Sequence, residues 1–144
     1  MNAPRRTLVA MAMAAAPLLA VADPCTGPNP NADQALGLAR SQKYVEAEAA
    51  ASAVLGTCAT QPVAVAALGQ SMVGQKRYDD AVAKMTTAIS AKRDLAYAYL
   101  WRGYAYYYKK QPDKMVGDFE TFLKLAPAAP EATTVKQLLA SIKR

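Results

Sequence analysis

The stretch LWRGYAYYYKKQP, residues 100–112, places five aromatic side chains within eight residues, around the small residue Gly103. Gly103 follows Gly69 at an interval that two further pairs share, Tyr44 with Tyr78 and Ala47 with Ala81. A fixed period of about 34 residues is typical of proteins built from stacked helical hairpins. The spacing therefore predicts a helical repeat.

The rest of the sequence agrees with a helical fold. After residue 30 nearly all of it fits helices of about 11 to 16 residues, separated by turns rich in Pro, Gly and Lys. The period-2 alternation that indicates strands is absent. With 144 residues the chain is long enough for one domain with a core and too short for two of ordinary size. We expect a single all-α domain.

The residues that recur with this period resemble the tetratricopeptide repeat (TPR), whose pattern is W-x2-L-G-x2-Y, then A-x3-F, then P. In the last repeat the matching residues are Tyr99, Gly103, Tyr106, Phe119 and Pro127, with Arg102 in place of leucine and Met115 in place of alanine. In the middle repeat they are Val65, Leu68, Gly69, Met72, Ala81 and Met85, with Arg93 in place of proline. The first repeat is the weakest and has Asn31, Gln34, Ala35, Leu38, Ala47, Ala51 and Ala59.

The resemblance implies about three antiparallel hairpins, stacked as a short right-handed solenoid over residues 31–129 after a Pro-rich lead at 23–30. Small residues let paired helices approach closely, so we expect Gly69 and Gly103 to receive the second helix of their own hairpins. The last hairpin needs a cover for its apolar face. Residues 130–144 suit this role as a capping helix. Its apolar stripe is Val135, Leu138, Leu139 and Ile142.

The N-terminal segment, residues 1–22, reads as an export signal. Arg5 and Arg6 precede an apolar run, and Ala20-Val21-Ala22 has the small-x-small form of a cleavage site, so we expect the exported chain to begin at Asp23. The run of about 14 residues is shorter than a membrane span needs. The paired arginines fit either the twin-arginine or the general secretory route. The predicted location is periplasmic or secreted.

Cys25 and Cys58 are the only cysteines in the chain, and export would place them where disulfides persist. If the first hairpin runs from about Asn31 to Gly56, the two cysteines flank its ends, which antiparallel packing brings together. A bridge would hold together the hairpin with the poorest core. Two free thiols are the alternative.

Two stripes divide the aromatic helix. Tyr99, Gly103 and Tyr106 carry the repeat pattern, so we expect them to face the partner helix. The second stripe recurs at i, i+4, i+7 and i+11 and consists of Tyr97, Trp101, Tyr104 and Tyr108. Aromatic side chains often anchor interfaces. This stripe is therefore either a binding surface or core beneath the capping helix, and some of its members could serve each purpose.

In TPR proteins the first helix of each hairpin lines a concave groove that holds a partner peptide. Carried onto this sequence, the groove would contain Tyr97, Leu100, Trp101, Tyr104 and Tyr108 from the last repeat, Val63, Ala66, Gln70 and Val73 from the middle one, and Leu36 and Arg40 from the first. TPR proteins that clamp the C-terminal carboxylate of cytosolic chaperones use Lys, Asn and Arg. The matching positions here are Ala32, Leu36, Ala67, Tyr97 and Trp101, which excludes that partner.

The composition argues against catalysis. The chain has no histidine, no nucleophile beside a base, no metal-ligand spacing and no phosphate-binding loop. Asp79-Asp80 suits a helix start, and Asp113, Asp118 and Glu120 suggest a solvated helix face. We expect no enzyme, no catalytic residue, no metal, no cofactor and no small-molecule substrate.

The remaining partner classes follow from charge. Without Arg5 and Arg6 the chain keeps 15 of its 17 basic residues against 11 acidic ones, which is mildly basic, and no basic arm is present. Nucleic acid is therefore not an expected partner. The predicted function is an exported adaptor that binds a peptide or protein segment in an aromatic groove. The alternative is a structural or assembly subunit of a bacterial envelope complex whose aromatic stripe stays buried.

Overall fold

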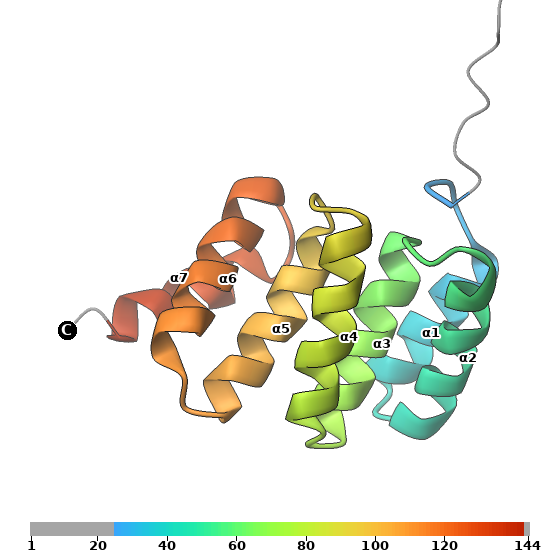
Figure 1. Cartoon of the computed structure of the whole chain (residues 1–144), viewed down its shortest axis with the longest axis horizontal. Coiled ribbons are helices and arrows are strands. Elements are labelled where there is room, and N and C mark those ends of the chain that lie inside the picture. Colours follow the sequence, from blue (N-terminus) through green and yellow to red (C-terminus); the bar gives the residue numbers. More distant parts are fainter. Residues whose placement is uncertain (1–24, 143–144) are drawn as a thin grey trace, which may run out of the picture.

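The computed structural model describes residues 25–142, and this part of the chain consists of helices joined by short turns (Figure 1). The expected signal peptide and its cleavage site lie outside the described residues. The helices are α1 (Pro30–Arg40), α2 (Tyr44–Thr57), α3 (Pro62–Gly74), α4 (Tyr78–Ala91), α5 (Ala96–Tyr108), α6 (Pro112–Leu125) and α7 (Ala132–Ile142).

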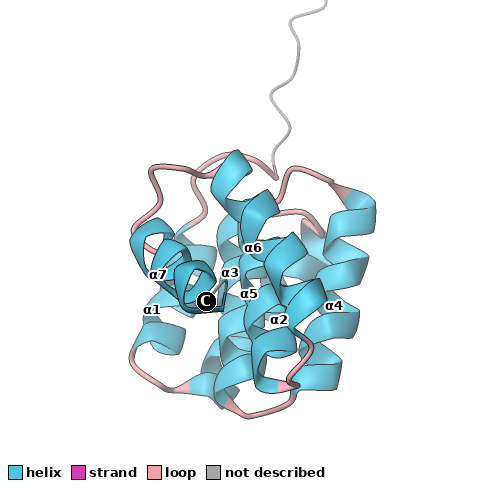
Figure 2. Ribbon diagram, turned by 90° about the vertical axis from the view of Figure 1, so that its left-hand side faces the viewer, coloured by secondary structure: helices cyan, strands magenta, loops and turns pink. Residues whose placement is uncertain are grey.

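The helices form three antiparallel hairpins, α1–α2, α3–α4 and α5–α6, which stack in sequence order (Figure 1). The first helices pack side by side, α1 on α3 and α3 on α5, and each second helix also contacts the first helix of the next hairpin. Figure 2, viewed from the C-terminal end, shows α7 covering the end of the stack. The predicted all-α stack of helical hairpins is confirmed.

The three turns inside the hairpins share one backbone design. Gln42, Lys76 and Lys110 are each one repeat period apart, and each has a positive φ, of 61°, 61° and 56°. In each turn the N–H of this residue and the next N–H both donate to carbonyls of the preceding helix, as in Lys76 N–H to Val73 and Arg77 N–H to Met72. This is the Schellman ending, which satisfies the last helical carbonyls. The sequence period therefore reappears as a repeated turn.

The glycines permit close approaches, although one of them differs from the prediction. A Cβ on Gly103 would lie 2.6 Å from ring carbons of Phe119 on α6, its own hairpin partner. This confirms the role predicted for Gly103. A Cβ on Gly69 would instead lie 2.6 Å from the Cβ of Trp101, on the next hairpin, with the Sδ of Met85 on α4 at 3.0 Å. Gly69 therefore serves mainly the contact between hairpins.

The cap helix covers a second apolar cluster. Val135 and Leu139 of α7 are buried against Leu100, Phe119 and Phe122. Leu138 is half-buried, and Ile142 remains 38% exposed. The predicted stripe therefore packs through its middle and leaves its last member at the surface.

One acidic residue that the sequence placed on a solvated face is buried. Asp118 is only 6% exposed, because Arg102 forms two hydrogen bonds with it, Nε to Oδ2 at 2.8 Å and Nη2 to Oδ1 at 2.7 Å. Arg102 stands where the TPR pattern has leucine, and its guanidinium also lies over the Tyr99 ring. The charge pair thus replaces an apolar contact between α5 and α6. Asp113 and Glu120 are exposed as expected.

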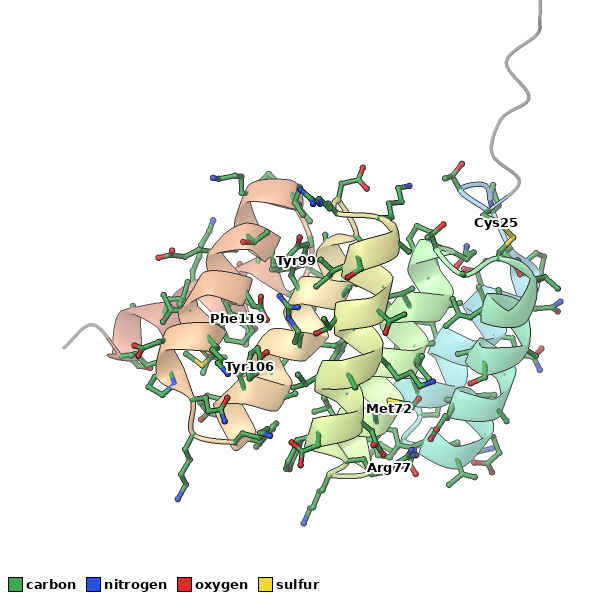
Figure 3. The ribbon with its side chains drawn as sticks, viewed as in Figure 1. Cys25, Met72, Arg77, Tyr99, Tyr106 and Phe119 are labelled. Carbon is green, nitrogen blue, oxygen red and sulfur yellow. A yellow bond between two sulfur atoms is a disulfide. The ribbon has the colours of Figure 1, made fainter. Side chains whose placement is uncertain are left out.

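The two cysteines form a disulfide, as predicted. Cys25 and Cys58 have their Cα atoms 5.1 Å apart, and the bond ties the segment before α1 to the end of α2. Figure 3 shows Cys25 at the N-terminal end of the stack. The bridge therefore fixes the first hairpin, whose core consists largely of alanines.

Candidate functional site

The aromatic stripe of α5 begins under the cap. Tyr97 donates a hydrogen bond from its hydroxyl to Glu131, just before α7, at 3.2 Å. Its ring is tilted onto Phe122, with centroids 6.0 Å apart. Tyr97 is thus held by the C-terminal part of the fold and offers only part of its surface to a partner.

Trp101 and Tyr104 occupy the middle of the stripe and are half-buried. Their ring centroids are 5.2 Å apart, and the Tyr104 ring meets Phe119 edge-on, also at 5.2 Å. Both residues contact the large cluster of α1 to α5 and the cluster beneath α7. The Nε1 of Trp101 is buried and has no hydrogen-bond partner among the described residues. These two side chains join the hairpins.

Tyr108 ends the stripe and is 51% exposed. Its ring stacks on Tyr78, with centroids 5.1 Å apart and planes 13° from parallel. A pocket of about 340 Å³ opens here, where α3 and α5 end and α2 and α4 begin. Its lining residues are Tyr44, Gln70, Val73, Gly74, Lys76, Tyr78, Trp101 and Tyr108. We call it the aromatic pocket.

The remaining groove residues divide into exposed and buried. Gln70 is partly exposed at the aromatic pocket, and Val73 reaches its wall although only 9% exposed. On α1, Arg40 is exposed and Leu36 is half-buried. On α3, Val63 is half-buried.

Two groove predictions are wrong. Leu100 is 0% exposed, because it points into the cluster that α6 and α7 cover. Ala66 is buried in the middle of α3. The resemblance gave the correct helix for both residues, but not the neighbours that cover their side chains.

Tyr44 and Tyr78 were predicted only as repeat markers, yet both line the aromatic pocket. The Tyr44 ring lies over Gly74, where a Cβ would overlap it. One period later Tyr78 meets Tyr108, which itself lies one period after Gly74. The pairs are therefore equivalent contacts in successive repeats. This shared period was the signal that could have placed both tyrosines at the site.

Burial and nearby charges raise the pKa of two tyrosines in the stripe, Tyr97 and Tyr104. Burial raises the pKa of Tyr97 above its ordinary value, and Glu131 raises it further while Arg40 partly offsets both. Burial also raises the pKa of Tyr104, with smaller contributions from Glu131 and Tyr108. Arg40 belongs to α1, which does not pack against α5.

A larger hollow of about 410 Å³ lies on the opposite face, between α2 and α4. Its floor is formed by core residues, among them Val65, Leu68 and Met72. Arg77 bridges its rim, because its Nη1 lies 2.7 Å from Glu48. Ser52, Lys84 and Thr87 also line the hollow, which contains none of the predicted groove residues.

Within residues 25–142 no group of three or more metal-ligating side chains gathers, and no helix is long and apolar enough to cross a membrane.

Comparison with known proteins bears on the fold. No family model matches the chain, and no curated protein sequence matches it. The similar solved structures include two TPR domains of one human protein. The first TPR domain of human RPAP3 is 23% identical with a TM-score of 0.63, over 77% of this chain and 91% of that domain. The second, solved with the HSP70 peptide SGPTIEEVD, is 24% identical with a TM-score of 0.63, over 79% of this chain and 92% of that one. The described part of the chain thus has the TPR-type fold of stacked helical hairpins.

Proposed function

We propose that the protein is a protein-interaction module that binds a peptide or protein segment on the face formed by α1, α3 and α5. The observation that carries the proposal is the aromatic pocket. Three tyrosines and one tryptophan converge there from the three helices α2, α4 and α5, and Tyr108 leaves half of its surface exposed. Large rigid aromatic side chains with a polar tip are the ones that most often anchor protein interfaces.

The second RPAP3 domain supports a peptide as the occupant, because it binds one on the same fold. The ligand proposed here is a different one. Of the five positions that match the carboxylate clamp, two are the fully buried alanines Ala32 and Ala67, and the other three, Leu36, Tyr97 and Trp101, carry no charge. None of these five residues supplies the cation that a C-terminal carboxylate needs when it loses its hydration.

We place this module outside the cytoplasm. The apolar N-terminal run with its small-x-small end supports export, and so does the pairing of both cysteines. The proposed location is periplasmic or secreted, with cleavage after Ala22.

Site-specific photo-crosslinking in the host tests the proposal. A photoreactive phenylalanine analogue is placed at Tyr108, and in a matched variant at Ala83, which is exposed on α4. Cross-linked products should form from position 108 and be absent from position 83, and mass spectrometry should find a segment of another protein in them.

Equal cross-linking from both positions would contradict a dedicated binding face. Cross-links from position 108 to a second copy of the chain, or to one stoichiometric subunit of an isolated envelope complex, would favour the assembly subunit instead.

A further inference from the structure

The three turns inside the hairpins lie along one edge of the stack, at the bottom of Figure 1. Each contains one residue in the left-handed conformation, and none of the three is glycine. Gln42 occupies this position in the first turn, Lys76 in the second and Lys110 in the third. A side chain in this conformation lowers stability relative to glycine, which is the usual residue at this point of a Schellman turn.

Two of these unfavourable positions therefore carry lysine beside the proposed binding face. Residues held in sparsely populated backbone conformations concentrate at functional sites. A residue type that is unfavourable for its backbone conformation points to function where its side chain places a specific chemical group at the surface. Here the group is an ammonium. Lys76 lines the aromatic pocket itself. Lys110 borders a neighbouring hollow of about 320 Å³ beside Tyr107.

The ammonium groups of these two lysines are free of ion pairs within residues 25–142. The cation next to each one is already paired. Arg77 lies 2.7 Å from Glu48 and 2.9 Å from Asp80, and Lys109 pairs with Asp79. Figure 3 shows Arg77 at the lower edge of the α3–α4 hairpin. The edge thus presents two uncompensated positive charges, one in the pocket that Tyr108 lines and one in the hollow beside Tyr107.

We propose that this edge binds an acidic segment of a protein partner. Carboxylates of the segment contact the ammonium groups of Lys76 and Lys110, and a large apolar or aromatic side chain enters the aromatic pocket. The inference rests on the proposed function and names the chemistry of its partner. A pocket of about 340 Å³ that contains one lysine, with a second lysine at the next turn along the edge, fits a peptide better than a flat lipid surface or a regularly charged nucleic acid.

Glycine substitutions test the contribution of the two lysine charges to binding separately from their effect on stability. The variants are Lys76→Gly and Lys110→Gly, and the matched control is Gln42→Gly, which relieves the same backbone conformation without removing a charge. The probe is a labelled synthetic peptide in which glutamates flank one phenylalanine, together with a twin in which every glutamate is glutamine. Fluorescence anisotropy measures affinity at low salt, and a thermal melt of the oxidised protein measures stability.

All three variants should melt at or above the wild-type temperature, because glycine relieves the left-handed residue. Lys76→Gly and Lys110→Gly should each bind the acidic peptide roughly 2- to 5-fold more weakly, the scale of an exposed ion pair. Gln42→Gly should bind like wild type. The glutamine twin should bind more weakly than the acidic peptide.

Wild-type affinity in both lysine variants, or equal affinity for the two peptides, would overturn the acidic partner while leaving a peptide-binding face intact. Binding of neither peptide would overturn it as well, and photo-crosslinking from position 108 would then show separately whether the proposed function survives. Displacement of the acidic peptide by anionic lipid vesicles or by single-stranded DNA, at matched charge, would assign the edge to a membrane or a nucleic acid instead.

Discussion

The Cβ of Trp101 lies 2.6 Å from the place that a Cβ on Gly69 would occupy, so the two hairpins meet at a point where one side chain is missing and another is large. Trp101 then spreads between two apolar clusters and contacts Tyr104. This arrangement changes what the aromatic stripe is expected to do. Its middle joins the hairpins, and its end at Tyr108 is the part that is open to a partner.

Trp101→Ala should therefore lower the free energy of unfolding by about 2–4 kcal/mol, because it empties space between two hairpins. Tyr108→Ala should stay within about 1 kcal/mol of wild type, since half of that side chain is in solvent and it loses one ring stack with Tyr78 and one edge-on contact with the exposed Tyr107. Urea denaturation of both variants measures the difference. Equal losses would show that Tyr108 is as structural as Trp101.

Glycine-to-alanine changes should have opposite signs at two helical positions. Gly103→Ala should destabilise by about 1–3 kcal/mol, because the new methyl overlaps the Phe119 ring. Gly37→Ala, on α1, should stabilise by about 0.5–1 kcal/mol, because nothing lies within 4 Å of a Cβ there and alanine favours the helix. Thermal melts of both variants test this, and a stabilised Gly103→Ala would mean that α5 and α6 are not in contact at that glycine.

Removing one partner of the Arg102–Asp118 pair should lower the free energy of unfolding strongly, whereas replacing both partners by apolar residues should lower it little. Asp118→Ala leaves the guanidinium without its carboxylate in a mostly buried position and should destabilise by about 3–5 kcal/mol. The double variant Arg102→Leu/Asp118→Leu should recover most of that loss, because it restores an apolar contact between α5 and α6.

Arg77→Ala is the matched control, and it should cost at most about 1 kcal/mol because the pairs of Arg77 are exposed. Chemical denaturation of all three variants measures these differences. A double variant as unstable as Asp118→Ala would show that the site requires charge.

Deprotonation of Tyr97 should account for part of the loss of stability at alkaline pH. Burial and Glu131 raise the folded-state pKa of Tyr97 above the unfolded value of about 10, so the folded protein holds this proton more tightly. The resulting stabilisation is fully present below about pH 10 and is lost as the pH rises through the folded pKa.

Tyr97→Phe should therefore show a shallower decline of melting temperature between about pH 9 and pH 12. Glu131→Gln, which removes one cause of the shift, should fall between that variant and wild type. An unchanged decline in Tyr97→Phe would exclude Tyr97 as a source of the alkaline loss.

Reduction of the disulfide should lower the free energy of unfolding by about 3–4 kcal/mol in the chain-entropy model, since the cysteines are 33 residues apart. Cys25→Ser/Cys58→Ser should behave like the reduced protein. Hydrogen exchange should show the loss concentrated in α1 and α2, because the bond closes that hairpin alone. Equal melting temperatures of oxidised and reduced samples would argue against any stabilising role.

The sequence by itself determined the helices, the hairpins and their repeat period, and it indicated the cysteine pair. These features are local, because helical periodicity, turn residues and the ends of one hairpin depend on residues close together in the chain. The same period recurs in the three Schellman turns, but the sequence pattern did not indicate their left-handed residues.

Only the tertiary structure decided what covers each side chain. Leu100 and Tyr108 lie on the same helix, yet α6 and α7 cover the first and leave the second open. Likewise, Asp118 has the residue type of a solvated face, and Arg102 makes its burial possible. A sequence pattern shows which side of a helix is apolar, but the angle and register of stacking decide which neighbour lies over each residue, because those depend on packing between helices distant in the chain.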